Sequence, residues 1–259
     1  MKLTIENKTK LEMFVALFQL LKNWGSHINL QFQEDHLYIQ GMDKSHVCLA
    51  NIVIQSKWFT TYSINVEQTN SAAVDSTHFA VMLNYALKHS KMELVLDATD
   101  DKLNINFVNN KETKDTFDHF FEIPLMDIEE DALGIPKIEY DVDFSVDSKK
   151  FSDLISELCV FGNELHVKCS EEVLEFNSSG DLGKLKVNIP IDDLNEFAIS
   201  EGEQIETFYS LNHIGKMCMS TKLGPQITIS ISHDYPMNIK YDLGDDSSVS
   251  FYIAPKMKD

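Results

Sequence analysis

Apolar side chains recur with helical spacing in four stretches of the chain. In each stretch they stand at positions i, i+3, i+4 and i+7, which places them on one face of a helix. This pattern predicts helices near residues 7–23, 76–89, 148–158 and 209–221. Ser148 precedes the third apolar stripe, so we expect it to cap that helix at its N-terminus.

Most of the remaining chain alternates between apolar and polar residues, as half-buried strands do. Clusters of Gly, Asn and Asp separate these runs and predict turns. The expected strands cover residues 28–32, 36–40, 46–54, 92–96, 103–108, 165–169, 173–177, 227–232 and 238–241.

The order of helix, strands, helix, strands occurs twice along the chain. Leu11 in the first helical stripe and Phe151 in the third are 140 residues apart. Phe79 in the second and Leu211 in the fourth are 132 residues apart. Offsets this similar indicate an internal duplication, which predicts two domains of about 125 residues that are built alike.

The segment 124–136 divides the two halves. It has a proline at each end, acidic residues at its centre and no helical periodicity, which is typical of an extended linker. A solvated spacer does not need the apolar residues Leu133 and Ile135, so we expect them to belong to a docking surface. The predicted domains are then residues 1–123 and 137–259.

The C-terminal segment is an apolar strand that breaks at Pro255. Chain ends are usually polar and frayed, whereas this one continues past its last strand with apolar residues. Exposed apolar patches mark docking sites for partners. The patch expected here consists of Tyr252, Ala254, Pro255 and Met257.

The chain has 259 residues and a net charge of −19. All 22 basic residues are lysine, and arginine is absent. Guanidinium chemistry, such as an arginine finger or the bidentate reading of guanine, is therefore excluded. We expect the surface as a whole to repel phosphate and the protein not to read DNA sequence.

The charge is unevenly spread. The four helical segments, counted over residues 7–24, 75–91, 148–158 and 209–222, hold nine lysines and four acids, so the rest of the chain carries −24. A single lysine on a solvated helix face needs no special explanation, but four helices of which none is net negative predict a basic patch in an acidic body. Lysine attracts phosphate without fixing register, which suits loosely held DNA. The candidate DNA-binding residues are Lys8, Lys10, Lys22, His78, Lys88, Lys91, Lys149, Lys150, His213, Lys216 and Lys222.

The sequence contains no catalytic or metal-binding motif. Glycine-rich nucleotide loops, the G-x-S-x-G elbow and the H-E-x-x-H helix are absent. The four cysteines lack metal spacing, which favours free thiols in a reducing compartment. The acids between 97 and 101 could bind Mg²⁺, but the alternating runs that flank them favour a hairpin turn, and Asp245 and Asp246 are expected in a similar turn. We expect no enzymatic activity, no cofactor and no metal.

No apolar run approaches the roughly 18 residues that a membrane-spanning helix needs. Residues 13–21 follow two glutamates and precede no clear cleavage site, so they are interpreted as a helix and not as the core of a signal peptide. We expect no membrane partner and no secretion.

Five motifs resemble, in the same order, those of the eukaryotic sliding-clamp family, proliferating cell nuclear antigen. They are GMDKSHVCL at 41–49, LGIP at 133–136 with Tyr140 after it, NSSGDLG at 177–183, DYP at 234–236 and YIAPK at 252–256. The resemblance spans residues 1–258. The family usually carries arginines in its channel, so this chain resembles a divergent member, such as one from a virus or a protist.

The resemblance implies an α+β clamp fold with two similar domains, each made of paired βαβββ units. It implies a homotrimer closed head-to-tail into a ring, with helices lining the channel and sheets outside. Such a ring would encircle double-stranded DNA without reading its sequence and act as a polymerase processivity factor. It would tether DNA polymerase, clamp loader, nuclease and ligase for replication and repair, in the nucleus or in a viral replication compartment.

The resemblance also implies two sets of site residues, carried over by position. Edge strands near 116–123 and 182–189 would join neighbouring subunits, with contacts from Phe117, Phe120, Phe121, Leu185, Val187 and Ile189. A pocket for a short peptide of the partner would be formed by Met42, His46, Val47, Leu49, Leu133, Ile135, Pro236, Tyr252, Ala254 and Pro255.

Two alternatives stay open. The chain could be one subunit of a heterotrimeric checkpoint-type clamp, which shares the fold. It could also be a monomeric processivity factor that binds DNA without a ring. The mass in solution separates the second alternative from a ring, and mixing with sister subunits separates the first.

Overall fold

The structure is a computed structural model that describes residues 1–65, 71–97, 100–109, 117–128 and 132–256. Met257 of the expected C-terminal patch lies outside the described residues. The chain forms two compact units. Unit 1 comprises Met1–Lys44, Ala50–Leu133 and Leu243–Val249, and unit 2 comprises Ser45–Leu49, Gly134–Asp242 and Ser250–Asp259. Each unit thus takes a short segment from the other half of the sequence.

Two helices pack against each other in unit 1. Helix α1 (Lys8–Leu21) begins after Asn7, whose side chain accepts a hydrogen bond from the Lys10 amide at 3.1 Å. Helix α2 (Ser76–Leu83) is capped in the same way by Asp75 and continues as a 3-10 turn, η2 (Asn84–Lys88). The rings of Phe18 and Phe79 meet edge-on at 4.8 Å between α1 and α2. These contacts bury the apolar stripe of α1 and Phe79, Leu83 and Ala86 of the second stripe, whereas Leu87 on η2 stays exposed.

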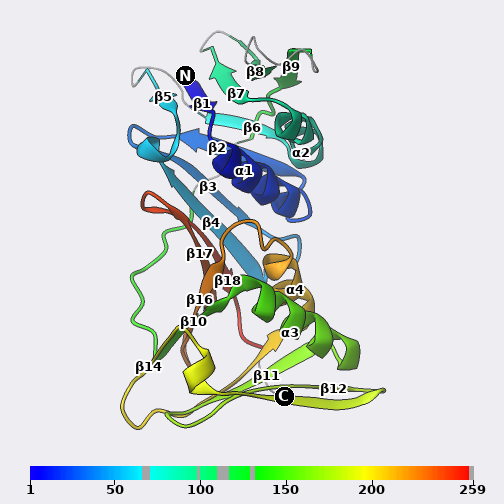
Figure 1. Ribbon diagram of the computed structural model, residues 1–259, viewed down its shortest axis with the longest axis vertical. Coiled ribbons are helices and arrows are strands. Elements are labelled where there is room, and N and C mark those ends of the chain that lie inside the picture. Colours follow the sequence, from blue (N-terminus) through cyan, green and yellow to red (C-terminus); the bar gives the residue numbers. More distant parts are fainter. Residues whose placement is uncertain (66–70, 98–99, 110–116, 129–131, 257–259) are drawn as a thin grey trace. The chain divides into compact units, whose positions relative to one another are not determined.

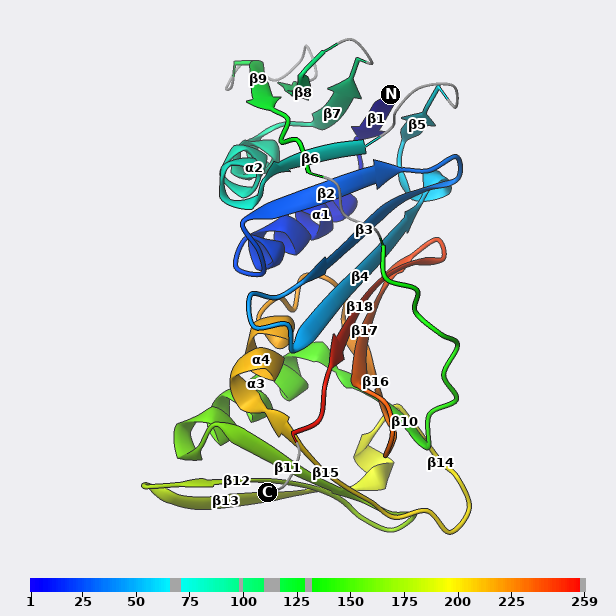
Figure 2. The same ribbon diagram turned by 180° about the vertical axis from the view of Figure 1, so that it is seen from behind.

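The strands of unit 1 form an antiparallel sheet in the order β5-β1-β7-β8-β9 and a second run of neighbours, β4-β3-β2-β6 (Figures 1 and 2). Strand β9 is therefore an edge strand. A short 3-10 turn, Ser56–Trp58, follows β4. The strand bounds are β1 Lys2–Ile5, β2 His27–Phe32, β3 His36–Met42, β4 Cys48–Gln55, β5 Thr61–Ser63, β6 Ser71–Asp75, β7 Lys91–Leu96, β8 Lys102–Val108 and β9 His119–Pro124.

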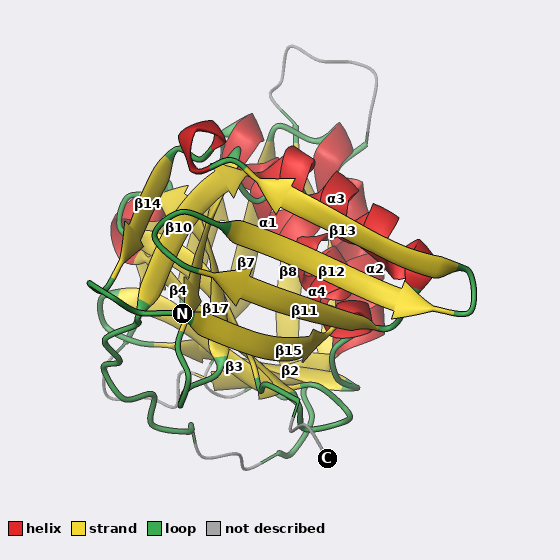
Figure 3. Cartoon of the chain, turned by 90° about the horizontal axis from the view of Figure 1, so that it is seen from below, coloured by secondary structure: helices red, strands yellow, loops and turns green. Residues whose placement is uncertain are grey.

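Unit 2 repeats this plan. Helices α3 (Ser148–Phe161) and α4 (Leu211–Cys218) pack together over one face of a sheet ordered β13-β12-β11-β15 (Figure 3). A second run of neighbours is β14-β10-β16-β17, and a 3-10 turn spans Ile191–Asp193. The strand bounds are β10 Val142–Asp147, β11 Glu164–Cys169, β12 Leu174–Gly180, β13 Gly183–Ile189, β14 Glu196–Ile199, β15 Ile205–Ser210, β16 Gln226–Ile231, β17 Met237–Gly244 and β18 Ser247–Ile253.

The segment Leu243–Val249 completes the core of unit 1. The indole of Trp58, which is fully buried, donates to the Leu243 carbonyl at 3.0 Å. The Gln55 amide donates to the Ser247 hydroxyl at 2.9 Å. The two residues between β17 and β18, Asp245 and Asp246, both have positive φ, as a tight hairpin turn requires. This turn confirms the prediction for these two acids.

The end of α3 lies very close to β12. A Cβ atom at Gly162 would stand 2.4 Å from the Ser179 carbonyl oxygen, and one at Gly180 would stand 2.3 Å from the Phe161 carbonyl oxygen. Real Cβ atoms do not approach backbone that closely, so only glycine fits at either position.

The structure corrects three predictions. The N-cap of α3 is Asp147, which accepts from the Lys150 amide, and Ser148 instead donates its hydroxyl to the Gly224 carbonyl at 2.7 Å. The fourth helix is shorter than its stripe, because residues 205–210 pair with β11 as strand β15. Strand β4 begins at Cys48, so His46 lies before the strand, with a φ of 55°.

Candidate docking site and nucleic-acid interface

The C-terminal segment of unit 2 is held in place after β18 ends. The Ala254 amide donates to the Val47 carbonyl at 3.2 Å, and the Lys256 amide donates to the Phe208 carbonyl at 2.7 Å. The Lys256 ammonium also pairs with Glu164 at 3.2 Å. These bonds place Ala254 beside Val47, two residues that the family resemblance assigns to one pocket.

Two half-buried tyrosines, Tyr140 and Tyr252, also belong to unit 2. The Tyr140 hydroxyl donates to the Pro236 carbonyl at 3.3 Å. Burial raises the pKa of Tyr140, and the neighbouring Tyr252 adds to that rise. Burial likewise raises the pKa of Tyr252. Both phenols are therefore neutral at physiological pH, and the half-buried Tyr252 offers a partner an apolar ring with one polar tip.

In unit 1, a glutamine fastens the linker. The Leu133 amide donates to Oε1 of Gln40 at 2.6 Å, and Nε2 of Gln40 donates to the Leu133 carbonyl at 2.9 Å. The side chain of Leu133 stays 52% exposed, and Met42 at the end of β3 is exposed too. The backbone is thus tied down while the apolar side chain remains available.

The ten candidate pocket residues divide between the units. Met42 and Leu133 belong to unit 1, and the other eight belong to unit 2. Within unit 2, Leu49 and Ile135 are half-buried, whereas His46 is exposed. Sequence reasoning missed Gln40 and Phe208, because the Gln40 side chain and the Phe208 carbonyl bond to the backbone of residues far away in the chain.

The candidate DNA-binding residues of unit 1 differ in how far they are neutralised. Lys10 is 2.6 Å from Asp245, donates to the Trp58 carbonyl and lies over the Trp58 ring, so it has a structural role. Lys91 belongs to strand β7, not to a helix, and its ion pair with Glu93 raises its pKa.

The remaining candidates of unit 1 face no carboxylate within 3 Å among the described residues. Lys22 donates to the neutral side chain of Gln19 at 2.8 Å. His78 lies 3.4 Å from Asp75. Lys8 and Lys88 are exposed and form no ion pair with any residue that the structure describes. The lysines among them leave positive charge at the surface of unit 1.

In unit 2, Lys149 is neutralised by Asp153 at 2.7 Å. Lys150, Lys216 and Lys222 are exposed, and no ion pair is recorded for them in the part of the chain that the structure describes. Within the observed helix bounds, η2 included, six lysines stand against three acids. The surplus on the helices is thus +3, smaller than the sequence windows gave, because three lysines (Lys22, Lys91 and Lys222) and one acid (Asp75) fall outside the helices.

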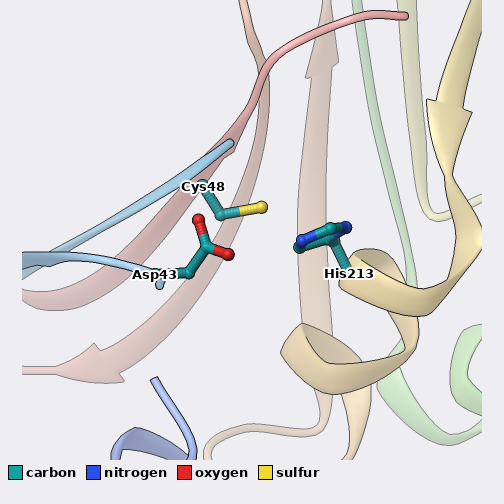
Figure 4. A group of neighbouring side chains, drawn as sticks. All are labelled: Asp43, Cys48 and His213. Atoms are coloured by element: carbon teal, nitrogen blue, oxygen red, sulfur yellow. The ribbon is translucent and has the colours of Figure 1, made fainter. Parts of the chain in front are cut away.

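His213 is engaged inside unit 2. Its Nδ1 is 2.8 Å from the Ser210 hydroxyl and its Nε2 is 3.0 Å from the Ser45 hydroxyl. Figure 4 shows the thiol of Cys48 directed toward this ring. Both ring nitrogens are therefore occupied, which gives His213 a positioning role in this unit and leaves it poorly placed to bind a phosphate.

The two candidate subunit-contact strands both lie at sheet edges. Strand β9 ends the sheet of unit 1, and β13 ends the β13-β12-β11-β15 sheet of unit 2. Phe117 and Phe120 are 89% and 70% exposed. Phe121 instead packs against Tyr85 and against Phe107, with ring centroids 5.2 and 5.8 Å apart. Leu185 and Val187 on β13 are half-buried, as is Ile189.

The cysteines are free, as predicted. Burial raises the pKa of Cys169 to about 11 and that of Cys218 to about 12, so neither forms a reactive thiolate at neutral pH. Among the described helices, none combines the length and apolar character needed to cross a membrane.

Comparison with known proteins identifies the family. The model of the N-terminal domain of proliferating cell nuclear antigen matches residues 6–132, and that of its C-terminal domain matches residues 134–256. The proliferating cell nuclear antigen of Chaetomium thermophilum is 25% identical over 244 residues, which cover 92% of each chain. The chain therefore belongs to the proliferating cell nuclear antigen family, as a divergent member with the α+β clamp fold and the replication role of a sliding clamp.

Proposed function

We propose that three copies of this chain close into a homotrimeric ring around double-stranded DNA. The observation that carries this proposal is that β9 and β13 each end a sheet and have, among the described residues, no strand paired on their outer side. Exposed edges invite pairing with another strand. A head-to-tail contact between two different edges closes into a cyclic oligomer when the rotation per subunit fits. The exposed rings of Phe117 and Phe120 supply apolar surface for that contact.

Light scattering at several concentrations tests the ring. A species near three times the chain mass of 29.6 kDa is expected. Phe120→Asp should shift the equilibrium toward monomer, because it buries a charge at the contact. Val173→Asp is the matched control, since Val173 is exposed but precedes β12 outside both edges. A monomer at every concentration would overturn the ring and favour a heterotrimeric clamp or a non-encircling factor.

We also propose that unit 2 docks partner peptides at the surface formed by Val47, Tyr252, Ala254 and Pro255. A half-buried aromatic ring beside a fixed extended segment suits a short peptide with aromatic and aliphatic anchors. The partners would be DNA polymerase, clamp loader, nuclease and ligase. In this proposal the chain does no chemistry itself and works in the nucleus or in a viral replication compartment.

The proposed domains are residues 1–123 and 137–259, joined by a connecting loop at 124–136. The helix pairs α1–α2 and α3–α4 would face the DNA. Their uncompensated charges are lysines, which attract phosphate without reading bases. Few contacts of this kind give weak and salt-sensitive affinity, which permits sliding.

A further inference from the structure

A buried histidine joins the end of η2 to the start of β9. His89 is 8% exposed. Its Nδ1 lies 2.7 Å from the Tyr85 carbonyl oxygen, and its Nε2 lies 2.9 Å from the Phe117 carbonyl oxygen. Nδ1 of His119 is a third neighbour, 3.0 Å from the same Nε2.

The chemistry of these partners determines the protonation of the ring. A carbonyl oxygen only accepts hydrogen bonds, so each nitrogen of His89 must donate. A neutral imidazole carries one N–H and cannot donate from both nitrogens. The geometry is satisfied when His89 is an imidazolium, with Nε2–H shared between the Phe117 carbonyl and a neutral His119.

Neutral carbonyl oxygens, and no carboxylate among the described residues, accept hydrogen bonds from the charged His89 ring. Among the described residues no ion pair is recorded for His89, and the ring of Phe107 covers one side at 5.7 Å. Glu6, an acid that lines the adjoining hollow, lies 3.7 Å from the ammonium of Lys91. The titratable and charged groups around His89 are Tyr85 and Lys88 on η2, His119 on β9, and Glu6, Lys8 and Lys91 along the hollow.

We propose that protonated His89 fastens the start of β9 to η2, so that this edge is firmest at low pH and loosens as pH rises. When the ring loses one proton, a nitrogen lone pair faces a carbonyl oxygen and that contact becomes repulsive. Protonation of His89 therefore favours the fastened edge and deprotonation favours the loosened one, which gives the stated sign. Histidine changes charge between about pH 5 and 8. If β9 is the subunit contact proposed above, ring stability follows the same pH dependence, and this last step rests on that proposal.

Hydrogen exchange of the amides of residues 117–124 tests the device directly. After correction for the intrinsic pH effect, we expect protection at pH 8.5 to be about tenfold lower than at pH 6, the size of one charged hydrogen bond. His89→Gln should abolish this difference. His36→Gln is the matched control, because His36 lies on β3 and pairs with Asp35. Equal protection at both pH values in the native chain would overturn the proposal.

Nitrogen NMR of the native chain gives a second test that needs no variant. At pH 6 both ring nitrogens of His89 should carry protons, and a single neutral tautomer at that pH would contradict the assignment. Both measurements are made at concentrations where light scattering has fixed the mass. If the protein is a monomer in which the protection of β9 depends on pH, the proposed ring is wrong but the proposed role of His89 at β9 is supported.

Discussion

At the scale of single residues, the positions that tolerate substitution least are those where two backbone segments approach each other closely. Gly180→Ala would place a methyl group 2.3 Å from the Phe161 carbonyl oxygen, so either α3 or β12 must move. We expect the free energy of unfolding to fall by about 1–3 kcal/mol, the usual cost of overpacking. Urea unfolding measures the change. Gly134→Ala is the control, because nothing lies within 4 Å of its Cβ position, and its effect should stay within about 0.5 kcal/mol.

Tyr252 is the residue on which the docking proposal depends most. Tyr252→Ala removes a half-buried ring beside Ala254, so affinity for a peptide from a partner polymerase should fall at least tenfold, as for an interface hot spot. Fluorescence titration with the labelled peptide measures it. Val173→Ala, an exposed apolar truncation elsewhere in unit 2, should bind normally. Unchanged affinity in Tyr252→Ala removes the pocket assignment.

The lysines without ion pairs make a separate prediction. Lys150→Glu with Lys216→Glu should weaken retention on DNA and flatten its salt dependence, because the slope falls by about 0.9 for each phosphate that the protein no longer neutralises. Lys240→Glu changes the charge of unit 2 on strand β17 instead of on a helix, and should have little effect. If both variants behave alike, net charge and not the helix surface governs DNA binding.

At the scale of elements, the linker is fastened by a single side chain. Gln40→Ala removes both hydrogen bonds to Leu133, and the Leu133 amide should then exchange roughly five- to tenfold faster, because each bond contributes about 1 kcal/mol. Gln31→Ala on neighbouring β2 is the control. If exchange at Leu133 stays the same, the linker is held by other contacts.

The elements that sequence reasoning found are those whose periodicity runs over several turns or strand residues. Helix α1 was predicted nearly to its ends, because its apolar stripe is long and Asn7 caps it. Strands β5 and β14 have only three and four residues, too few to show alternation. The clamp motifs pointed to Leu133, but the bond that positions it comes from Gln40, 93 residues away. No local pattern encodes such a contact.

At the scale of the whole molecule, encirclement differs from surface binding. A closed ring loaded on circular DNA should remain bound in high salt and should leave linear DNA by sliding off its ends. A protein held by lysines alone should be removed from both DNAs by salt. Gel filtration of loaded complexes before and after linearisation compares the two. Dissociation from circular DNA in high salt would contradict the ring.

The exchange of short segments between the units bears on how this chain can be divided. A fragment that stops at residue 133 keeps Lys10 and Trp58 but loses their partners, the carboxylate of Asp245 and the carbonyl of Leu243. The complementary fragment, which begins at residue 134, contains those groups but lacks the rest of the unit 1 core that they complete. We therefore expect the linker to tolerate a nick, with both pieces staying associated and folded, while neither piece is stable when expressed alone. Two fragments divided at the linker should therefore be functional only when they are produced together.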